Sequence, residues 1–368
     1  MVNDDRQVPP CPYFGRCGGC AWQDIKYTAQ LQRKEEQVRA LFGACRPIIP
    51  SPDLYYYRNR MDYAFGPEWT LGLKASRFRV IDLDKCLLMS EQSNELLLTI
   101  KRFAAAAQLP VYEFRRGLLR HVVIREGKNI GNTIVNILTS DQGILPAADL
   151  WSVLGDRVVG LTWSINRSPA DRSAGDIQQT FGQDYYEEKL AGLTFRVPVQ
   201  SFFQTNVRAA ENIIKTVKEL IDLRGAGTLL DLYSGTGSIG LSLAASVKQV
   251  IGIEENKEAV ELSRSNAGRN AIDNYAAHAG RAEDILPTFK EQVDLVVVDP
   301  PRPGLHKKVV GKLGELKARQ IIYVSCNPLT QKNDVEMLLS FGYKMTACQP
   351  LDLFPHTPHL ENIISLAL

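Results

Sequence analysis

Two residues near the carboxyl end of the chain have side chains suited to nucleophilic and proton-transfer chemistry. Cys326 follows the apolar run QIIYVS and precedes an Asn-Pro turn, whereas Cys348 lies within a later apolar run. A thiol at a strand end beside polar residues is placed for reactivity, and a thiol inside an apolar run is expected in the core. Glu361 begins the last apolar run, just after His356 and His359. The sequence therefore predicts Cys326 as a nucleophile and Glu361 as a general base, with the two histidines as competing bases.

A glycine-rich turn upstream has the spacing of a nucleotide-binding loop. The run TLLDLY leads into SGTGSIG, in which Gly235 and Gly237 begin a G-x-G-x-x-G pattern. Glycines let the backbone approach a ligand closely, and Glu254, at the end of the next apolar run, is placed to hold ribose hydroxyls. The run VDLVVVDPPRPG carries Asp299 before two prolines. Because ligands of open α/β sheets bind at the carboxyl ends of the strands, we expect Glu254, Asp299 and Cys326 around one pocket.

Three of the seven cysteines lie close together near the start of the chain. Cys11, Cys17 and Cys20 form C-x5-C-x2-C in a glycine-bearing run. Three thiolates need a fourth ligand to complete a tetrahedral zinc site or to hold an iron–sulfur cluster, and Cys45 and Cys86 are both candidates. The spacing does not choose between zinc and iron–sulfur, and a metal-free triplet is a third interpretation.

Hydrophobic periodicity divides the chain into three parts. Residues 1–49 contain the cysteine run and an amphipathic helix, which we expect to be exposed, over 23–42. Residues 50–198 predict an α+β domain with a helix at 92–107. Residues 199–368 alternate helices with apolar strands, which predicts a doubly wound parallel sheet covered on both faces. The other expected strands are 118–125, 132–139 and 158–165 in the middle part, and a closing hairpin-like pair near 342–348 and 362–367.

Composition is that of a globular protein, with 45% hydrophobic and 23% charged residues among 368. No apolar run approaches the roughly 18 residues needed to span a bilayer, and the start is too polar for a signal peptide, so we expect a cytoplasmic protein without membrane contact. A net charge of +2 does not by itself indicate nucleic-acid binding. Local basic clusters on alternating strands are the candidates for phosphate contacts. They are Arg58, Arg60, Lys74, Arg77, Arg79, Arg115, Arg116, Arg120, Arg125 and Lys128.

These motifs, in this order, resemble the RNA uracil-C5 methyltransferase family, whose members modify 23S ribosomal RNA or tRNA. The resemblance runs through CPYFGRCGGC, DLDKC, YRNRMDYAFG, QSFFQTN, DLYSGTGSIGL, VDPPRPG, YVSCNPLT and FPHTPHLE, almost the full length. It implies a C-terminal Rossmann-like methyltransferase domain and an N-terminal α+β RNA-binding domain with an iron–sulfur motif. It also implies S-adenosyl-L-methionine as methyl donor, nucleophile Cys326 and general base Glu361. The implied donor contacts are Gln204, Tyr233, Glu254 and Asp299, and the implied [4Fe–4S] ligands are Cys11, Cys17, Cys20 and Cys86.

The implied reaction explains the need for a thiolate. Carbon 5 of uracil is a poor nucleophile, but addition of a thiolate to C6 gives an enolate whose C5 can attack a methyl group. We expect the site to lower the pKa of Cys326 below the ordinary thiol value of about 8.5. A uridine shielded by stacking must be flipped out, and we expect Pro301 and Arg302 to line the pocket that receives it.

Some features depart from the family pattern. The cysteine motif begins at residue 11, so we expect this chain to lack the small β-barrel RNA-binding domain with which some members begin. Arg281 stands where many methyltransferases place an acid near adenine, and Glu283 and Asp284 are the substitutes nearby. We expect 23S ribosomal RNA ahead of tRNA as substrate, and no obligate protein partner. An RNA cytosine-C5 methyltransferase and a non-catalytic RNA-binding protein on the same fold remain alternatives.

Overall fold

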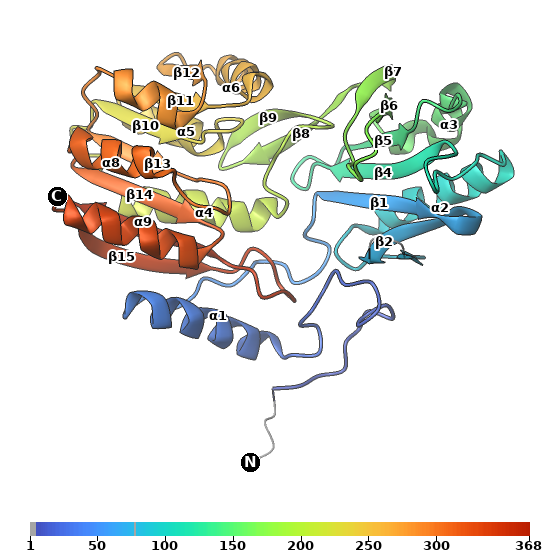
Figure 1. Ribbon diagram of the computed structural model, residues 1–368, viewed down its shortest axis with the longest axis horizontal. Coiled ribbons are helices and arrows are strands. Elements are labelled where there is room, and N and C mark those ends of the chain that lie inside the picture. The colour runs from blue at the N-terminus through green and yellow to red at the C-terminus, as the bar shows by residue number, and fades with distance from the viewer. Residues whose placement is uncertain (1–4, 77–78) are drawn as a thin grey trace. The chain divides into compact units, whose positions relative to one another are not determined.

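The computed structural model describes residues 5–76 and 79–368, which form two compact units (Figure 1). These units do not follow the expected boundaries of 1–49, 50–198 and 199–368, because the segment after the cysteine run joins the second unit. The first unit comprises Met1–Lys26, Asp53–Lys189 and Arg196–Val207, and the second comprises Tyr27–Pro52, Leu190–Phe195 and Arg208–Leu368.

The first unit is built on a seven-stranded sheet of order β3-β2-β1-β4-β5-β6-β7, in which only β5 and β6 pair in parallel among the described strands. The apolar sides of helices α2 and α3 share one core with this sheet. The helix expected at 92–107 and the three strands expected here are confirmed to within two residues. The elements are β1 Arg60–Gly66, β2 Thr70–Ser76, β3 Arg79–Asp82, α2 Glu91–Ala106, β4 Leu119–Glu126, β5 Thr133–Thr139, α3 Ala147–Leu154, β6 Gly160–Ile165 and β7 Asp176–Gly182. Strands β8 (Tyr185–Leu190) and β9 (Leu193–Pro198) form a separate two-stranded sheet.

The second unit contains the expected doubly wound sheet, of order β12-β11-β10-β13-β14-β16-β15. Strands β10 to β14 are parallel, and β16 is antiparallel to both of its neighbours, β14 and β15. The expected closing pair of strands is therefore confirmed. The elements are α1 Tyr27–Phe42, α4 Val207–Leu220, β10 Thr228–Leu232, α5 Ser238–Leu243, β11 Gln249–Glu254, α6 Lys257–Arg269, β12 Tyr275–Ala279, α7 Ala282–Ile285, β13 Leu295–Val298, α8 Lys307–Leu316, β14 Gln320–Ser325, α9 Pro328–Ser340, β15 Lys344–Leu351 and β16 Glu361–Ala367.

Apolar residues on both faces of these strands explain why the sheet is covered on both sides. Leu230 and Leu232 of β10 belong to a core with residues of α8 and α9, while Leu229 belongs to a second core with residues of α4 and α5. Alternate side chains of a strand point to opposite faces, so a continuous apolar strand needs helices on each face. The parallel strands consequently bring their carboxyl ends to one edge of the sheet.

Helix α1 is less exposed than its amphipathic sequence suggests. The helix begins at Tyr27, and Val38 lies in the core of the second unit. Lys34, whose side chain is fully buried, donates from Nζ to Asp352 Oδ1 at 2.7 Å and to the carbonyl oxygen of Phe354 at 3.1 Å. Gln30 accepts from the backbone N–H of His356 at 2.7 Å. Helix α1 thus holds the segment 352–360 that leads to β16.

No helix within residues 5–76 and 79–368 combines the length and the apolar character needed to cross a membrane.

Replacing Lys34 tests this anchor. The Lys34→Met variant should lose about 3–5 kcal/mol of unfolding free energy, because the Asp352 carboxylate stays buried without its cation. A Lys34→Met/Asp352→Leu double variant removes both charges and should recover most of that loss. Urea denaturation followed by circular dichroism measures both. Equal loss in the two variants would show that the ion pair is not what the segment depends on.

Candidate functional site

Cys326 and Glu361 come from neighbouring strands that run in opposite directions. Ser325, the last residue of β14, pairs with Asn362 of β16. The next residue in each direction past that pair is Cys326 on one strand and Glu361 on the other, so they lie opposite each other at the carboxyl edge of the parallel strands. Cys326 is partly exposed and Glu361 is 6% exposed. The structure therefore brings together the two residues for which the sequence predicts covalent and acid–base chemistry.

Burial and nearby acids favour the protonated form of both groups. Burial raises the pKa of the Cys326 thiol, Glu361 and Asp299 raise it further, and Arg302 lowers it. Burial likewise raises the pKa of Glu361 well above its ordinary value, with Asp299 adding to the rise and Arg302 opposing it. The expectation of a lowered thiol pKa is wrong, because burial of the thiol is the largest effect and Glu361 and Asp299 add to it against the single guanidinium of Arg302.

The loop after β13, residues 299–305, carries Asp299 and Arg302 and is fastened to the first turns of α9. Asn327 Nδ2 and Thr330 Oγ1 each donate to the carbonyl oxygen of Arg302 at 3.1 Å. Asp334 Oδ2 accepts from the backbone N–H of Leu305 at 2.8 Å. Asn327, Thr330 and Asp334 are three and four residues apart, which places them on one helix face.

Asp334 also orders the strand that carries the thiol. Its Oδ2 accepts from the hydroxyl of Tyr323 in β14 at 2.6 Å. Gly304 has a φ of 85°, and a Cβ there would come within 2.7 Å of the same oxygen. None of the three anchoring residues of α9 is among the predicted site residues, although their spacing after the Asn-Pro turn is a signal that a helix face points back at the loop.

The glycine-rich loop follows β10 at the same edge of the sheet. Tyr233, Gly235 and Gly237 all have positive φ, at 61°, 53° and 83°. A Cβ on Gly235 would meet nothing within 4 Å, so the turn has open space beside it. Glu254 accepts from the backbone N–H of Gly235 at 3.0 Å and from that of Asn256 at 2.9 Å. The carboxylate therefore shapes the loop in which the sequence predicts ligand binding.

A further buried acid at this edge, Asp231, is missing from the predicted residues. It is 1% exposed, and its Oδ2 accepts from the backbone N–H of Gly240 at 3.0 Å. Burial raises its pKa to about 7, with further increases from Asp299 and Glu254, and burial raises the pKa of Asp299 to about 7 as well. Its signal in the sequence is an acid within the otherwise apolar run TLLDLY. Carboxyl groups that disfavour one another's ionisation suit a cationic ligand.

The histidines and the Arg281 region have contacts of their own. His356 is buried, with Nδ1 at 3.2 Å from Gln30 Nε2, and His359 Nδ1 lies 3.5 Å from a guanidinium nitrogen of Arg302. The strand register places Glu361, and neither histidine, opposite the thiol.

At the end of β12, Arg281 forms an ion pair with Glu283. From the sequence, we expect Glu283 or Asp284 to supply the acid that is missing at position 281. In the structure Glu283 is instead engaged by Arg281.

Four cysteines come together in the first unit. Cys11, Cys17, Cys20 and Cys86 line one small cavity, together with apolar side chains such as Leu73. Cys45 belongs to the second unit, where its Sγ lies 3.9 Å from the carbonyl oxygen of Glu35. The structure thus selects Cys86 over Cys45 as the fourth member of the group. Within the described part of the chain, no group of three or more His, Cys, Asp and Glu side chains is arranged to hold a metal ion.

Enclosure makes ionisation of Cys20 and Cys86 costly. Burial raises the pKa of Cys20 to about 12 and that of Cys86 to about 11, and the other cysteines of the group raise both further. Only a positively charged group bound among the sulfurs would stabilise four thiolates in this cavity.

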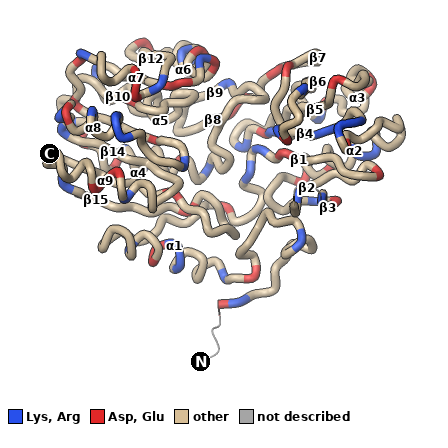
Figure 2. The backbone as a smooth tube through the Cα atoms, viewed as in Figure 1, with Lys and Arg blue, Asp and Glu red and all other residues tan. Residues whose placement is uncertain are grey.

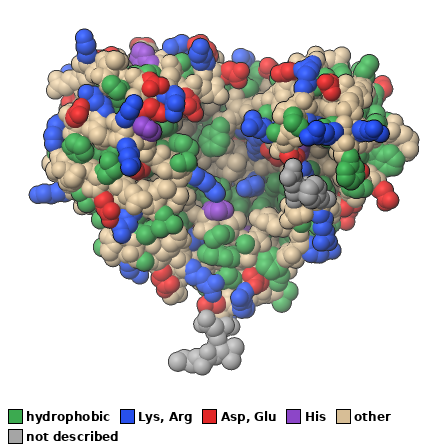
Figure 3. Space-filling model, in the orientation of Figure 1, with side chains coloured by type: hydrophobic (Ala, Val, Ile, Leu, Met, Phe, Trp, Pro, Cys, Tyr) green, Lys and Arg blue, Asp and Glu red, His purple; other side chains and the backbone are tan. Residues whose placement is uncertain are grey.

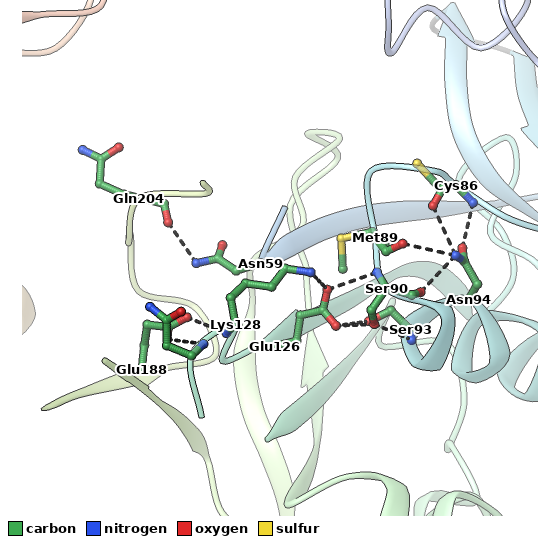
Figure 4. A network of polar contacts seen from close by, with 11 residues as sticks. Asn59, Cys86, Met89, Ser90, Ser93, Asn94, Glu126, Lys128, Glu188 and Gln204 are labelled. Atoms are coloured by element: carbon green, nitrogen blue, oxygen red, sulfur yellow. Dashed lines mark hydrogen bonds and ion pairs between the residues drawn. The ribbon is translucent and has the colours of Figure 1, made fainter. Parts of the chain in front are cut away.

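Gln204 belongs to the first unit, whereas the other five predicted donor-binding residues belong to the second. Its carbonyl oxygen accepts from Asn59 Nδ2 at 2.9 Å (Figure 4). The carbonyl oxygen of Asn59 in turn accepts from the backbone N–H of Glu126 at 2.9 Å. Asn59 therefore links the Gln204 segment to the end of β4.

The same network continues from Glu126 to the cysteine cavity (Figure 4). Glu126 Oε2 accepts from Ser93 Oγ at 2.9 Å and also from Ser90, the residue that caps α2. Asn94 of the same helix accepts from the backbone N–H of Cys86 at 2.7 Å. Asn94 Nδ2 also donates to the carbonyl oxygen of Ser90 at 2.9 Å, so buried and partly buried hydrogen bonds run from Cys86 to Gln204 within one unit.

Several basic residues expected to contact phosphates are structural instead. Arg120 is buried and donates to carbonyl oxygens of residues 166–170, and Arg125 is fully buried and donates to those of 198–201. Lys74 pairs with Asp171, and Lys128 with Glu126. Long cationic side chains satisfy several buried carbonyls at once, which the alternating strand pattern does not reveal.

The remaining basic candidates vary in exposure. Arg58 and Arg60 are partly buried, with Arg60 bonded to Asp62, and Arg77 lies outside the described residues. Arg79, Arg115 and Arg116 are exposed. Lys and Arg residues occur on and near strands β1 and β4 (Figure 2). Basic side chains also gather on the visible face of the first unit (Figure 3).

Comparison with known proteins places these features in one family. The sequence model described as tRNA (Uracil-5-)-methyltransferase matches residues 170–367. A tRNA (uracil(54)-C(5))-methyltransferase of Pyrococcus horikoshii is 37% identical over 97% of this chain and 85% of its own length. An uncharacterized RNA methyltransferase of Clostridium tetani is 36% identical over 97% of this chain and 83% of its own length. The chain belongs to the tRNA (uracil-5-)-methyltransferase family.

The fold agrees with this membership. The structure of the Pyrococcus abyssi tRNA (uracil-54, C5)-methyltransferase, solved with S-adenosyl-L-homocysteine, matches with a TM-score of 0.86 and 33% identity, covering 95% of this chain and 86% of that one. The resemblance in the sequence motifs is therefore confirmed, as is the expected class of enzyme, an RNA (uracil-5-)-methyltransferase.

The charge balance at the thiol of this methyltransferase can be tested by alkylation. The rate at which iodoacetamide modifies Cys326, followed by peptide mass spectrometry, should rise with pH around a midpoint above the ordinary thiol pKa of about 8.5. Arg302→Ala should move that midpoint upward, because Arg302 stabilises the thiolate.

Lys332→Ala is the matched control, since Lys332 is a cation of α9 whose partner is Glu336 at 3.7 Å. Its midpoint should equal that of the unmodified enzyme. An unchanged midpoint in Arg302→Ala would contradict the assignment of Arg302.

Proposed function

We propose that this enzyme transfers a methyl group from S-adenosyl-L-methionine to C5 of a uridine in folded RNA, with Cys326 as covalent nucleophile and Glu361 as general base. The observation that carries the proposal is the register of β14 and β16, which sets the thiol opposite a buried carboxyl group. A nucleophile and a base side by side are what C5 methylation of a pyrimidine requires.

The donor site is proposed at the carboxyl edge of β10, β11 and β13. Gly235 and Gly237 bend the loop so that its backbone can approach the donor, Glu254 is placed for the ribose, and Tyr233 and Asp299 flank the pocket. When bound, S-adenosyl-L-methionine supplies an electrophilic methyl group and a positive charge, which suits acids whose pKa values are raised by one another. Gln204 completes the proposed contacts on the grounds of the family resemblance. The Pyrococcus abyssi relative was solved with S-adenosyl-L-homocysteine, which supports this donor.

The proposed reaction starts with the Cys326 thiol and the Glu361 carboxyl group both ionised. Cys326, as thiolate, adds through Sγ to C6 of the uracil ring, the C5–C6 double bond opens, and the negative charge spreads to O4. The electron pair at C5 then forms the new bond to the methyl carbon, while the bond from that carbon to the donor sulfur breaks and its electron pair stays on sulfur. The Glu361 carboxylate removes the remaining C5 proton, the C5–C6 double bond forms again, and the thiolate leaves. Arg302 favours the ionised forms of both residues.

The RNA must present its uridine outside the base stack. A uridine inside a stack cannot reach Cys326, so we propose that it is flipped out towards the 299–305 loop, where Pro301 and Arg302 are exposed. From the sequence, we expect 23S ribosomal RNA ahead of tRNA, whereas two of the relatives are named for uracil 54 of tRNA. We also propose that the enzyme works in the cytoplasm.

We further propose that Cys11, Cys17, Cys20 and Cys86 hold a [4Fe–4S] cluster. Support comes from the four thiols sharing one apolar cavity and from the raised pKa values of Cys20 and Cys86, which a bound cationic group would offset. Four thiolate ligands are the usual set for such a cluster. Its proposed role is structural, since Cys86 begins the hydrogen-bond network that ends at Gln204.

The covalent step can be trapped. RNA carrying 5-fluorouridine should form a protein–RNA adduct that survives a denaturing gel, because fluorine cannot leave C5 as a proton does. Cys326→Ala should give no adduct and background methyl incorporation, and Cys45→Ala should behave as the unmodified enzyme. Tritiated methyl incorporation into unmodified 23S ribosomal RNA and tRNA transcripts then identifies the substrate, and full activity of Cys326→Ala on either would falsify the mechanism.

Glu361→Gln separates the base from the nucleophile. This variant should still add Cys326 to ordinary uridine, but it cannot remove the C5 proton, so the methylated adduct should accumulate while turnover falls by about 10²–10⁴-fold. Unimpaired turnover would instead assign the base to another residue.

The cluster has a test that does not depend on activity. Protein purified without oxygen should be brown and contain iron and acid-labile sulfide, and Cys17→Ser should lose both. Cys45→Ser should keep both, since Cys45 lies in the other unit. A colourless protein that contains zinc would contradict the proposal.

A further inference from the structure

A tight turn in the first unit presents an aromatic side chain almost entirely to solvent. Residues 113–116, here called the 113–116 turn, precede β4 and close through two hydrogen bonds between the backbones of Glu113 and Arg116, at 2.7 and 2.8 Å. Phe114 at its tip is 96% exposed, the largest exposure among the large hydrophobic residues that the structure describes. Arg115 and Arg116 beside it are exposed as well.

The backbone of this turn is one that its residues disfavour. Phe114 has a φ of 47° and Arg115 a φ of 66°. Two-residue turns with positive φ at both central positions strongly prefer Asn-Gly or similar pairs, since a bulky side chain is strained there. A strained and solvent-exposed Phe-Arg pair adds nothing to the core, so its residue types need an explanation outside folding stability.

The turn is nevertheless firmly braced. Gln142 Nε2 donates to the carbonyl oxygen of Arg115 at 2.8 Å, and Gln142 Oε1 accepts from the backbone N–H of Gly117 at 3.2 Å. Gly117 has a φ of 101°, and a Cβ there would come within 2.1 Å of the carbonyl oxygen of Val111. A rigid tip keeps Phe114 exposed rather than letting it fold back onto the protein.

The base of the same hairpin is anchored by a buried arginine. The guanidinium of Arg120 lies 4.6 Å from the ring centre of Tyr112, and Arg120 also donates to the carbonyl oxygens of Asn166 and Ser168. Tyr112 in turn donates its backbone N–H to Leu119 at 2.8 Å, joining the hairpin to β4.

We propose that the 113–116 turn is an RNA-binding element in which the ring of Phe114 stacks on an unpaired base while Arg115 and Arg116 contact the flanking phosphates. The inference rests on the proposed RNA substrate. Among the described residues, neither arginine has an ion pair or a hydrogen bond from its side chain, so both charges are available to an anionic partner. An exposed aromatic ring beside cationic side chains is the arrangement that holds single-stranded nucleic acid, because every base offers a π-face.

Binding of the full-length protein to a single-stranded RNA oligonucleotide with one 2-aminopurine tests the proposal. The unmodified protein should quench the 2-aminopurine on binding, as a stacked ring does. Phe114→Ala should lose the quenching and raise Kd by about five- to a hundredfold. This is the loss of affinity expected when one stacking ring is removed. Phe114→Trp should retain the quenching and the Kd of the unmodified protein. Arg115→Ser and Arg116→Ser should each reduce the dependence of log Kd on log salt by about 0.7.

Ile130→Ala is the matched control, since Ile130 is a 41% exposed apolar residue in the turn at the opposite end of β4. Its affinity and quenching should equal those of the unmodified protein. The double variant Phe114→Asn/Arg115→Gly relieves the backbone strain, so its Tm should rise while its RNA affinity falls. Equal affinity in Phe114→Ala and the unmodified protein would overturn the proposal.

These readouts measure binding alone, so the two proposals can fail separately. Absence of methyl transfer with intact stacking contradicts the proposed function, and intact methyl transfer without stacking contradicts this one.

Discussion

The chemistry that we propose for this enzyme depends on the insertion of β16 between β14 and β15, antiparallel to both. In a sheet of purely parallel strands, the start of the last strand would lie at the edge away from the ligand. Reversal of β16 brings its first residue, Glu361, to the carboxyl edge, opposite Cys326. The segment before it, residues 352–360, must then be fixed on that edge. Lys34 and Gln30 of α1 do so through buried polar contacts.

Negative charge is the second constraint on this edge of the sheet. Burial raises the pKa values of Asp231, Asp299 and Glu361, and Asp299 raises those of the other two further. Arg302 offsets part of that charge at Cys326, and its loop is fastened by α9. An acidic pocket beside a protonated thiol is unfavourable for nucleophilic attack until positive charge arrives. If the proposed donor binds at this edge, its positive charge would favour the thiolate form of Cys326.

Arginines of the first unit have two different environments, one buried against backbone carbonyl oxygens and one exposed to solvent. Arg120 and Arg125 are buried and satisfy backbone carbonyls of loops that lack regular partners, so they order the unit rather than bind phosphate. Arg115 and Arg116 lie in the strained turn and stay in solvent. Desolvation separates the two pairs, because a guanidinium loses its hydration inside the sheet and must replace it with carbonyl oxygens.

The sequence by itself determined the doubly wound sheet, the positions of its strands and the residue types at their ends, since apolar periodicity and glycine spacing are local properties. It also indicated Cys326, Glu361 and the cysteine group. Only the tertiary structure decided that α1 joins the second unit and that the pKa of Cys326 is raised. Spacing alone left Cys45 and Cys86 open, the motif resemblance implied Cys86, and the shared cavity agrees with it. Asp231, Asn327 and Asp334 likewise emerged only there. Burial and the approach of charges distant in sequence set these properties, and no local pattern encodes either one.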